Sequence, residues 1–188
     1  MAQENNNLSR LVITLTIIGV ISALALAVVY QWTTPYIEEH QARAREEAIF
    51  SVLEGAVDYE ESTRNGITFF EGFDEGGNLV GVSFIARGSG YQGAIEIMVG
   101  YDPANGEILS ISVLNHEETP GLGARITEEE FKDNFANKPI GEYELVSREP
   151  TDPYEVETIA GATISARAVK NIVSEAGFTF EEYFGGGN

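Results

Sequence analysis

Thr163 stands in the segment of the chain that is best suited to hold a phosphate. Residues 160–162 before it are Ala-Gly-Ala, whose small side chains leave space beside the threonine hydroxyl. Ser165 follows, and both hydroxyls lie where the N-cap of a helix is expected. Backbone N–H groups and the dipole at a helix N-terminus favour an anion such as phosphate. The pattern therefore predicts either a phosphate site at this helix start or a helix cap and nothing more.

A second candidate segment covers residues 115–123, directly after a predicted strand. Pro120 fixes one backbone dihedral angle, and Gly121 and Gly123 allow the backbone to approach a flat or charged group closely. The same composition fits an ordinary tight loop that leads into the next helix. Taken alone, this segment leaves both interpretations open.

The composition excludes several classes of site. With 30 acidic and 11 basic residues, the formal net charge of −19 argues against a nucleic-acid partner, because phosphates bind clusters of Lys and Arg. The chain has no cysteine, which excludes disulfides, thiolate zinc sites and cysteine-ligated iron–sulfur clusters. Its two histidines, His40 and His116, are too few for a multi-histidine metal site. We therefore expect neither a metal site nor nucleic-acid binding.

A long uncharged stretch precedes both candidate segments. No charged residue occurs between Arg10 and Glu38, and the stretch is mostly apolar. At about 1.5 Å per residue, a helix of this length crosses a hydrocarbon core of about 30 Å. Trp32 and Tyr36 lie just past the apolar run of residues 11–29, where interfacial aromatic side chains belong. The pattern predicts a transmembrane helix over residues 11–32, in contact with the lipid bilayer.

Positive charge on the N-terminal flank sets the expected orientation of this helix. Arg10 and the α-amino group precede the span, so residues 1–10 are predicted to stay in the cytoplasm and the larger part to lie outside it. A cleaved signal peptide is the alternative, but its apolar region is only about 7–15 residues long. We therefore predict a retained single-pass anchor in the cell (inner) membrane.

A helical stalk is expected after the anchor. Pro35 is predicted to interrupt the helix or to mark its exit from the membrane. From residue 37 to about residue 53, Glu, Arg and Ala alternate with few apolar positions, which is typical of a stalk or of an amphipathic helix. We assign residues 33–60 to this stalk, residues 61–184 to an extracytoplasmic domain and residues 185–188 to a mobile tail.

The domain is predicted to be of the α+β class. Its first half holds segments rich in β-branched and aromatic residues, separated by turn signals, which predicts an antiparallel meander. A capping box at Thr127 is expected to open a short helix near Phe131. A last helix is expected from about Ser165 to Ala176, ended by Gly177. The meander strands are expected at residues 67–73, 79–86, 94–101 and 107–115, with a further short strand at 145–146. The expected fold is a curved antiparallel sheet with flanking helices.

Three motifs, in their order along the chain, resemble a known family. After the single span come Gly-Tyr-Gln-Gly at 90–93, Glu-Thr-Pro-Gly-Leu-Gly at 118–123 and Gly-Ala-Thr at 161–163. This arrangement resembles the FMN-binding G subunit of the Rnf ion-translocating oxidoreductase complex. It is also similar to the C subunit of the sodium-translocating NADH:quinone reductase, which is commonly longer than this chain. The resemblance covers nearly the whole chain and implies an FMN-binding domain.

The resemblance further implies a covalent flavin. In the family, a flavin transferase outside the cytoplasm joins FMN through its phosphate to a threonine hydroxyl, and Thr163 stands in the matching position. The implied role is electron transfer within a ferredoxin:NAD oxidoreductase complex that moves sodium ions or protons, with the other subunits as partners and no catalytic side chain in this one. The residues expected at the cofactor are Glu118, Thr119, Gly121, Leu122, Gly123, Gly161, Ala162, Thr163 and Ser165.

Two positions differ from the sequence motif that the flavin transferase usually modifies. Glu157 stands where Asp is usual, and Ala160 where Ser or Thr is usual. The attachment threonine itself is intact, and these two departures are the main support for an alternative function, that of a non-redox membrane scaffold with an empty flavin site. Two further candidates are the C subunit of the quinone reductase and a stand-alone extracytoplasmic flavin reductase. For the reductase, His116 is the obvious acid–base residue near the loop.

Overall fold

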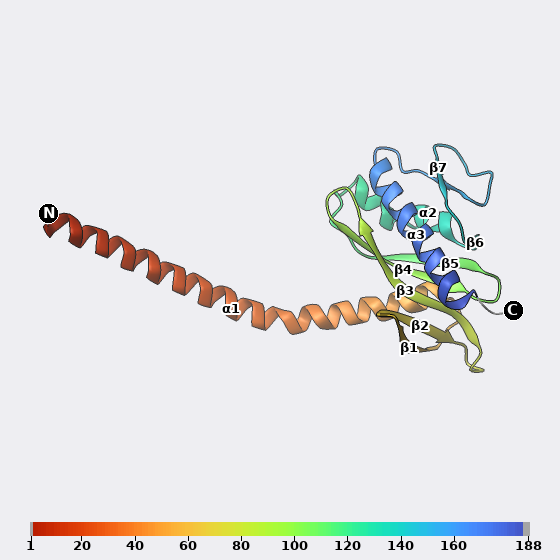
Figure 1. The fold of residues 1–188 in the computed structure, drawn as a ribbon, viewed down its shortest axis with the longest axis horizontal. Helices are drawn as coiled ribbons and strands as arrows, with labels where there is room; N and C mark the ends of the chain where they lie inside the picture. The colour runs from red at the N-terminus through yellow and green to blue at the C-terminus, as the bar shows by residue number, and fades with distance from the viewer. Residues whose placement is uncertain (1, 186–188) are drawn as a thin grey trace. The chain divides into compact units, whose positions relative to one another are not determined.

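The computed structural model describes residues 2–185, with side chains from residue 10 onward (Figure 1). The chain divides between Arg43 and Ala44 into two compact units. The predicted mobile tail, apart from Gly185, lies outside the described residues.

The first unit is formed by one helix, α1, which spans Ala2–Val52 and enters the second unit with its last turns. Its segment from Arg10 onward is long and apolar enough to cross a membrane, judged by length and composition. Pro35 lies inside the helix, so the predicted interruption there is wrong. A proline removes one N–H donor, but the hydroxyls of Thr33 and Thr34 donate to carbonyl oxygens one turn earlier, at 2.9 and 2.7 Å. One lost backbone hydrogen bond therefore does not end the helix.

The second unit is built on an antiparallel meander, as predicted. Its six strands lie in sequence order: β1 (Asp58–Arg64), β2 (Ile67–Phe73), β3 (Leu79–Ser89), β4 (Ala94–Asp102), β5 (Glu107–Asn115) and β6 (Lys138–Pro139). The four predicted meander strands correspond to β2, β3, β4 and β5. Strand β1 was not predicted, and it begins inside the range assigned to the stalk. Its sequence, DYEESTR, lacks the apolar alternation of a half-buried strand because β1 is an exposed edge.

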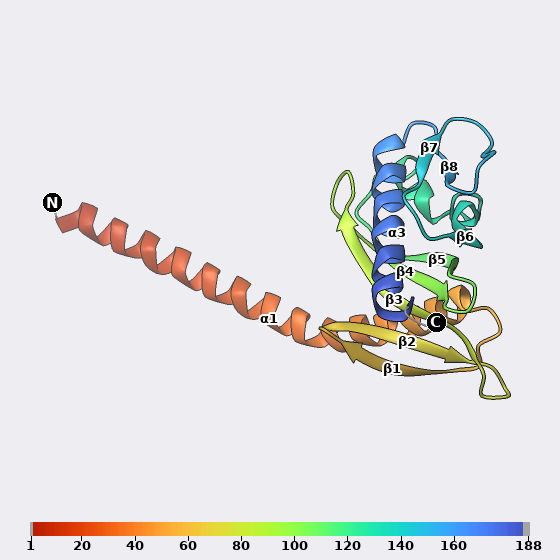
Figure 2. The same ribbon diagram turned by 45° about the vertical axis from the view of Figure 1, so that its right-hand side comes forward.

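Helices pack on both faces of this sheet, which confirms the α+β class. Helix α3 (Thr163–Phe184) runs across one face, where Phe69, Val82 and Val173 belong to the larger apolar core (Figure 2). The last turns of α1 pack on the other face, where Ile49 and Leu53 join a second apolar cluster. Burial of these apolar side chains holds the three layers together.

The connection between β5 and β6 contains three short helical segments: η1 (Gly123–Thr127), α2 (Glu129–Lys132) and η2 (Asp133–Phe135). The helix near Phe131 is confirmed, but the capping box is wrong. Glu128 occupies the N-cap of α2 without a side-chain cap bond, and the Thr127 hydroxyl instead donates to the Ala124 carbonyl at 2.9 Å. Thr127 is therefore held in the preceding η1 turn.

A small parallel ladder precedes α3. Strand β7 (Glu144–Val146) confirms the predicted short strand, and it pairs with β8 (Glu155–Glu157), which was not predicted. Helix α3 begins two residues earlier than predicted and continues past Gly177 to Phe184. Gly177 does not stop the helix, because its role is packing: a Cβ there would lie 3.1 Å from Cγ2 of Ile140.

Candidate functional site

The first turn of α3 leaves the Thr163 hydroxyl accessible. Gly161 has a φ of +80°, a left-handed conformation that favours glycine, and Ala162 is the N-cap of the helix. The N-cap makes no side-chain hydrogen bond, so neither Thr163 nor Ser165 is the predicted cap. Thr163 is exposed, and its hydroxyl makes no side-chain hydrogen bond within residues 10–185. The first N–H groups of the helix have no intrahelical acceptor, as at any helix start.

Ser165 is buried and takes part in a long-range contact. Its hydroxyl donates to Oε2 of Glu118 at 2.6 Å. A serine hydroxyl has one proton to donate, so in this arrangement it cannot also donate to a phosphate. Ser165 thus joins α3 to the loop after β5.

Glu118 joins three segments that are distant in sequence. Its side chain is buried, with 4% of its surface exposed. Oε1 accepts the N–H of Tyr91 at 2.6 Å and the N–H of Gln92 at 3.3 Å, while Oε2 accepts the Ser165 hydroxyl. These donors stabilise a carboxylate that would otherwise be costly to bury. A Cβ at Gly90 or Gly123 would collide with the carboxylate oxygens, so both glycines leave room for it.

The loop of residues 116–123 folds back on itself beside this carboxylate. The Thr119 carbonyl accepts the N–H of Leu122 at 3.2 Å and that of Ala124 at 3.1 Å. Gly121 has a φ of +75°, which this turn requires. Leu122 consequently points outward, with half of its surface (50%) exposed. Nδ1 of His116 accepts the backbone N–H of Glu118 at 3.2 Å, so this histidine stabilises the start of the loop.

These segments surround a cavity of about 450 Å³. That volume falls in the range of about 300–1,000 Å³ that is typical of small-molecule and cofactor sites. The cavity is lined by Tyr91, Glu118, Thr119, Leu122, Gly123, Gly161, Ala162, Thr163, Ile164 and Ser165. Eight of the predicted cofactor residues thus line one cavity, while Gly121 shapes the loop from outside that lining.

The sequence interpretation missed two lining residues, Tyr91 and Ile164. Both are large apolar side chains that are more than half exposed, at 64% and 52%. The signal for Tyr91 was an aromatic residue between two glycines at the tip of a predicted hairpin. Ile164 was not predicted because an apolar residue in the first turn of a helix gives no sign of a ligand site.

A smaller cavity of about 190 Å³ lies on the far side of residues 157–160. Three carboxylates, from Glu128, Glu130 and Glu157, line it together with Arg125. So much negative charge disfavours a phosphate. The larger cavity is therefore the better candidate for the anionic cofactor that the helix start favours.

The chain matches known proteins over this region and beyond it. The FMN-binding domain family matches residues 90–177, a range that contains every residue that lines the larger cavity. The G subunit of the ion-translocating oxidoreductase complex of Methanosarcina acetivorans is 30% identical over 181 residues, covering 92% of this chain and 94% of the relative. The chain belongs to this family of G subunits.

A further G subunit matches over a similar length. The G subunit of the proton-translocating ferredoxin:NAD(+) oxidoreductase complex of Clostridium ljungdahlii is 28% identical and covers 93% of this chain and 92% of the relative. Among solved structures, Shewanella oneidensis NqrC matches with a TM-score of 0.57, 23% identity and coverage of 72% of this chain and 73% of that one. At this identity the likeness shows a shared fold, which confirms the predicted architecture of an FMN-binding domain.

Proposed function

We propose that this chain is the electron-transferring G subunit of a membrane-bound, ion-translocating ferredoxin:NAD oxidoreductase, and that it carries FMN in the larger cavity. The proposal includes a phosphoester bond between the FMN phosphate and Oγ1 of Thr163. In forming it, Oγ1 loses its proton and displaces the leaving group that the flavin donor carries on that phosphate. One observation carries it: an exposed threonine hydroxyl without a side-chain partner stands on the first turn of α3, at the edge of a cofactor-sized cavity.

The residues present fit both ends of an FMN molecule. The first N–H groups of α3 and the helix dipole suit the phosphate. Arg167 follows Thr163 by one turn and is exposed, so it lies on the same side of the helix. The exposed side chains of Leu122 and Ile164 offer apolar surface for the isoalloxazine ring. FMN supplies the redox chemistry, whereas the protein sets its orientation and surroundings.

The cavity offers little for acid–base catalysis. Its one carboxylate, Glu118, already accepts hydrogen bonds from Tyr91, Gln92 and Ser165. His116 is absent from the described cavity lining, and its Nδ1 is engaged with the backbone. This arrangement favours a subunit that exchanges electrons with its partners over a reductase that acts on its own substrate. Thr163 then serves as the attachment point of the flavin and not as a catalytic nucleophile of the redox reaction.

The membrane anchor and the named relatives support the proposal that this chain is part of a membrane-bound oxidoreductase complex. We propose that residues 11–32 cross the bilayer, with the N-terminus in the cytoplasm and the second unit outside it. The Clostridium ljungdahlii relative is named as part of a ferredoxin:NAD(+) oxidoreductase complex, which supports this reaction class for the present chain. The partners are then the other subunits of the complex and, during maturation, a flavin transferase.

The mass of the full-length protein purified from its native membrane tests the proposal. The expected result is an added mass of FMN less one water, located on the peptide that contains Thr163. A Thr163→Ala variant should lack the addition, while a Thr163→Ser variant, which keeps the hydroxyl, is the matched control for the fold. An unmodified Thr163 in fully assembled native complex would overturn the covalent proposal.

A further inference from the structure

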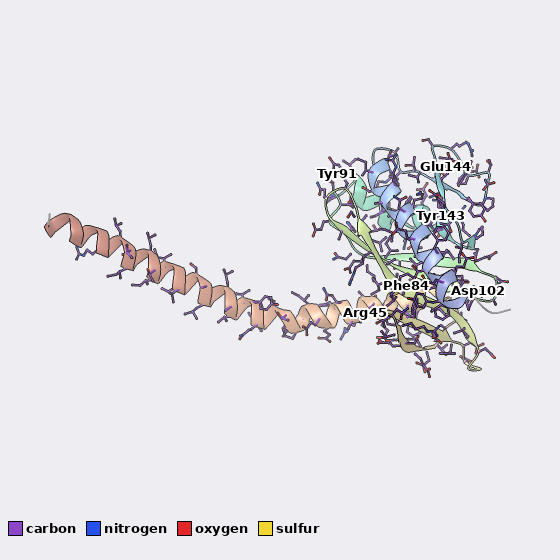
Figure 3. All side chains as sticks on the ribbon, viewed as in Figure 1. Arg45, Phe84, Tyr91, Asp102, Tyr143 and Glu144 are labelled. Atoms are coloured by element: carbon purple, nitrogen blue, oxygen red, sulfur yellow. The ribbon has the colours of Figure 1, made fainter. Side chains whose placement is uncertain are left out.

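Tyr91 stands at the tip of the hairpin formed by β3 and β4, beside the first turn of α3 (Figure 3). Its side chain is 64% exposed and lines the same cavity as Leu122 and Ile164. Tyr91 therefore adds an exposed aromatic ring to the apolar surface of the cavity wall. The position suits a ring that packs against a planar ligand.

The turn that carries Tyr91 is held in place by the side chain of Glu118. Within the turn, the N–H of Gly90 donates to the Gly93 carbonyl at 2.7 Å. The remaining hydrogen bonds of residues 90–93 in the described chain both go to Oε1 of Glu118, from the N–H groups of Tyr91 and Gln92. The direction of the Tyr91 side chain therefore depends on a carboxylate 27 residues further along the chain.

The same carboxylate also fixes the helix that carries Thr163. Oε2 of Glu118 accepts the hydroxyl proton of Ser165, which lies two residues after the proposed attachment point. The two walls of the cavity, the hairpin tip and the start of α3, are thus set relative to each other by one buried side chain. Glu118 accepts three hydrogen bonds from these two walls, so its carboxylate is fixed in place.

We propose that Tyr91 is a ligand-contacting residue that packs its ring against the flavin, and that Glu118 is a positioning residue that holds Tyr91 and α3 at the spacing the flavin requires. The inference rests on the proposed function, because it takes FMN on Thr163 as the occupant of the cavity. Tyr91 is thereby added to the residues that contact the flavin. Glu118 acts through Tyr91 and α3, which it holds in place.

Flavin fluorescence tests the contact, because a tyrosine ring in contact with an excited flavin quenches it by electron transfer, whereas phenylalanine is too hard to oxidise. Full-length chain is produced with its flavin transferase, and the flavin content on Thr163 is measured by mass for each variant. At equal flavin content, Tyr91→Phe should be severalfold brighter than the wild type. Its rotational correlation time from time-resolved anisotropy should be unchanged, because the aromatic ring is kept. Tyr154→Phe, at a partly exposed tyrosine outside the cavity lining, is the matched control and should stay as dim as the wild type.

Two variants of Glu118 distinguish the effect of its side-chain length from the effect of its negative charge. Glu118→Gln keeps the length and an accepting oxygen for Tyr91, so its flavin should stay quenched. Glu118→Asp keeps the charge but shortens the side chain by one methylene. Its flavin should therefore be brighter and its rotational correlation time shorter, although Tyr91 is intact. The opposite pattern, a bright Gln variant and a dim Asp variant, would overturn the positioning role.

The failure of this inference differs from the failure of the proposed function. A flavin-loaded Tyr91→Phe variant that is as dim as the wild type would show that the ring does not contact the flavin, and the covalent carrier would stand. A wild-type chain that never carries flavin on Thr163 would overturn both.

Discussion

The hydroxyl of Ser165 donates to Oε2 of Glu118 at 2.6 Å, across 47 positions of sequence. This contact joins the loop after β5 to the first turn of α3, and both groups are buried. It explains why two motifs that are far apart along the chain form one site. It also means that the geometry around Thr163 depends on a side chain that need not touch the cofactor.

Loss of this bond should destabilise the protein measurably. Ser165→Ala leaves a buried carboxylate oxygen without its donor, and hydrogen bonds to charged groups contribute about 1.5–3 kcal/mol. We expect the free energy of unfolding, measured by denaturant titration, to fall by about 2 kcal/mol. Thr179→Ala is the control, because Thr179 is a half-buried residue of the same helix whose hydroxyl bonds to the Glu175 carbonyl one turn earlier. Equal stabilities for the two variants would contradict the structural role of Ser165.

Ser83 should behave in the opposite way. Its side chain is fully buried (0% exposed) in β3, and its hydroxyl has no hydrogen-bond partner among the described residues. An unpaired buried hydroxyl costs about 1–3 kcal/mol, so Ser83→Ala should leave the free energy of unfolding unchanged or raise it by about 1 kcal/mol. A clear loss of stability in the same titration would show that the hydroxyl has a partner that this arrangement lacks.

Acid should weaken the contacts of Glu155, the first residue of β8, with the loop that joins β7 to β8. The hydrogen bond from the Arg148 side chain, followed by that from the Thr151 backbone N–H, lowers the pKa of Glu155 from 4.5 to about 2. A carboxyl whose pKa is lower in the folded state stabilises that state above its unfolded pKa and loses the effect as pH falls. We expect the melting temperature to drop as pH falls from about 4.5 towards 2, and the Glu155→Gln variant to show a smaller drop over that window. Identical pH profiles for the two proteins would exclude this contribution.

The sequence predicted the elements that have a clear periodicity or punctuation. Strands β2 to β5 are rich in β-branched and aromatic residues between turn signals, and α3 shows a helical apolar face, so both were found. Strand β1 was missed because it is a polar edge, and the continuation of α3 past Gly177 was missed because the packing against Ile140 is a tertiary contact. Local signals cannot report such contacts.

The candidate site was predicted in its composition but not in its connections. The motifs identified Glu118, Thr163 and Ser165, yet no local pattern shows that Ser165 serves Glu118 and not a helix cap. Tyr91 was left out for the same reason: the hydrogen bond that places it, from its N–H to Glu118, forms only when the hairpin folds against the loop. Sequence reasoning thus found Glu118 and Ser165 as residues but could not find the distant contact between them.

The two left-handed glycines of the cavity region offer a matched test of where strain matters. Gly161 precedes α3 with a φ of +80°, and Gly121 lies in the facing loop with a φ of +75°. An alanine at either position costs about 1–2 kcal/mol of backbone strain. Relief of that strain at Gly161 shifts the start of α3, and with it the Thr163 hydroxyl, whereas relief at Gly121 moves a loop that does not carry the attachment point. We therefore expect both variants to lose similar stability, but the fraction of chains with FMN on Thr163, read from the intact mass, to fall much further in Gly161→Ala. If the two variants were flavinylated equally, the conformation of Gly161 would have no special role in presenting the threonine.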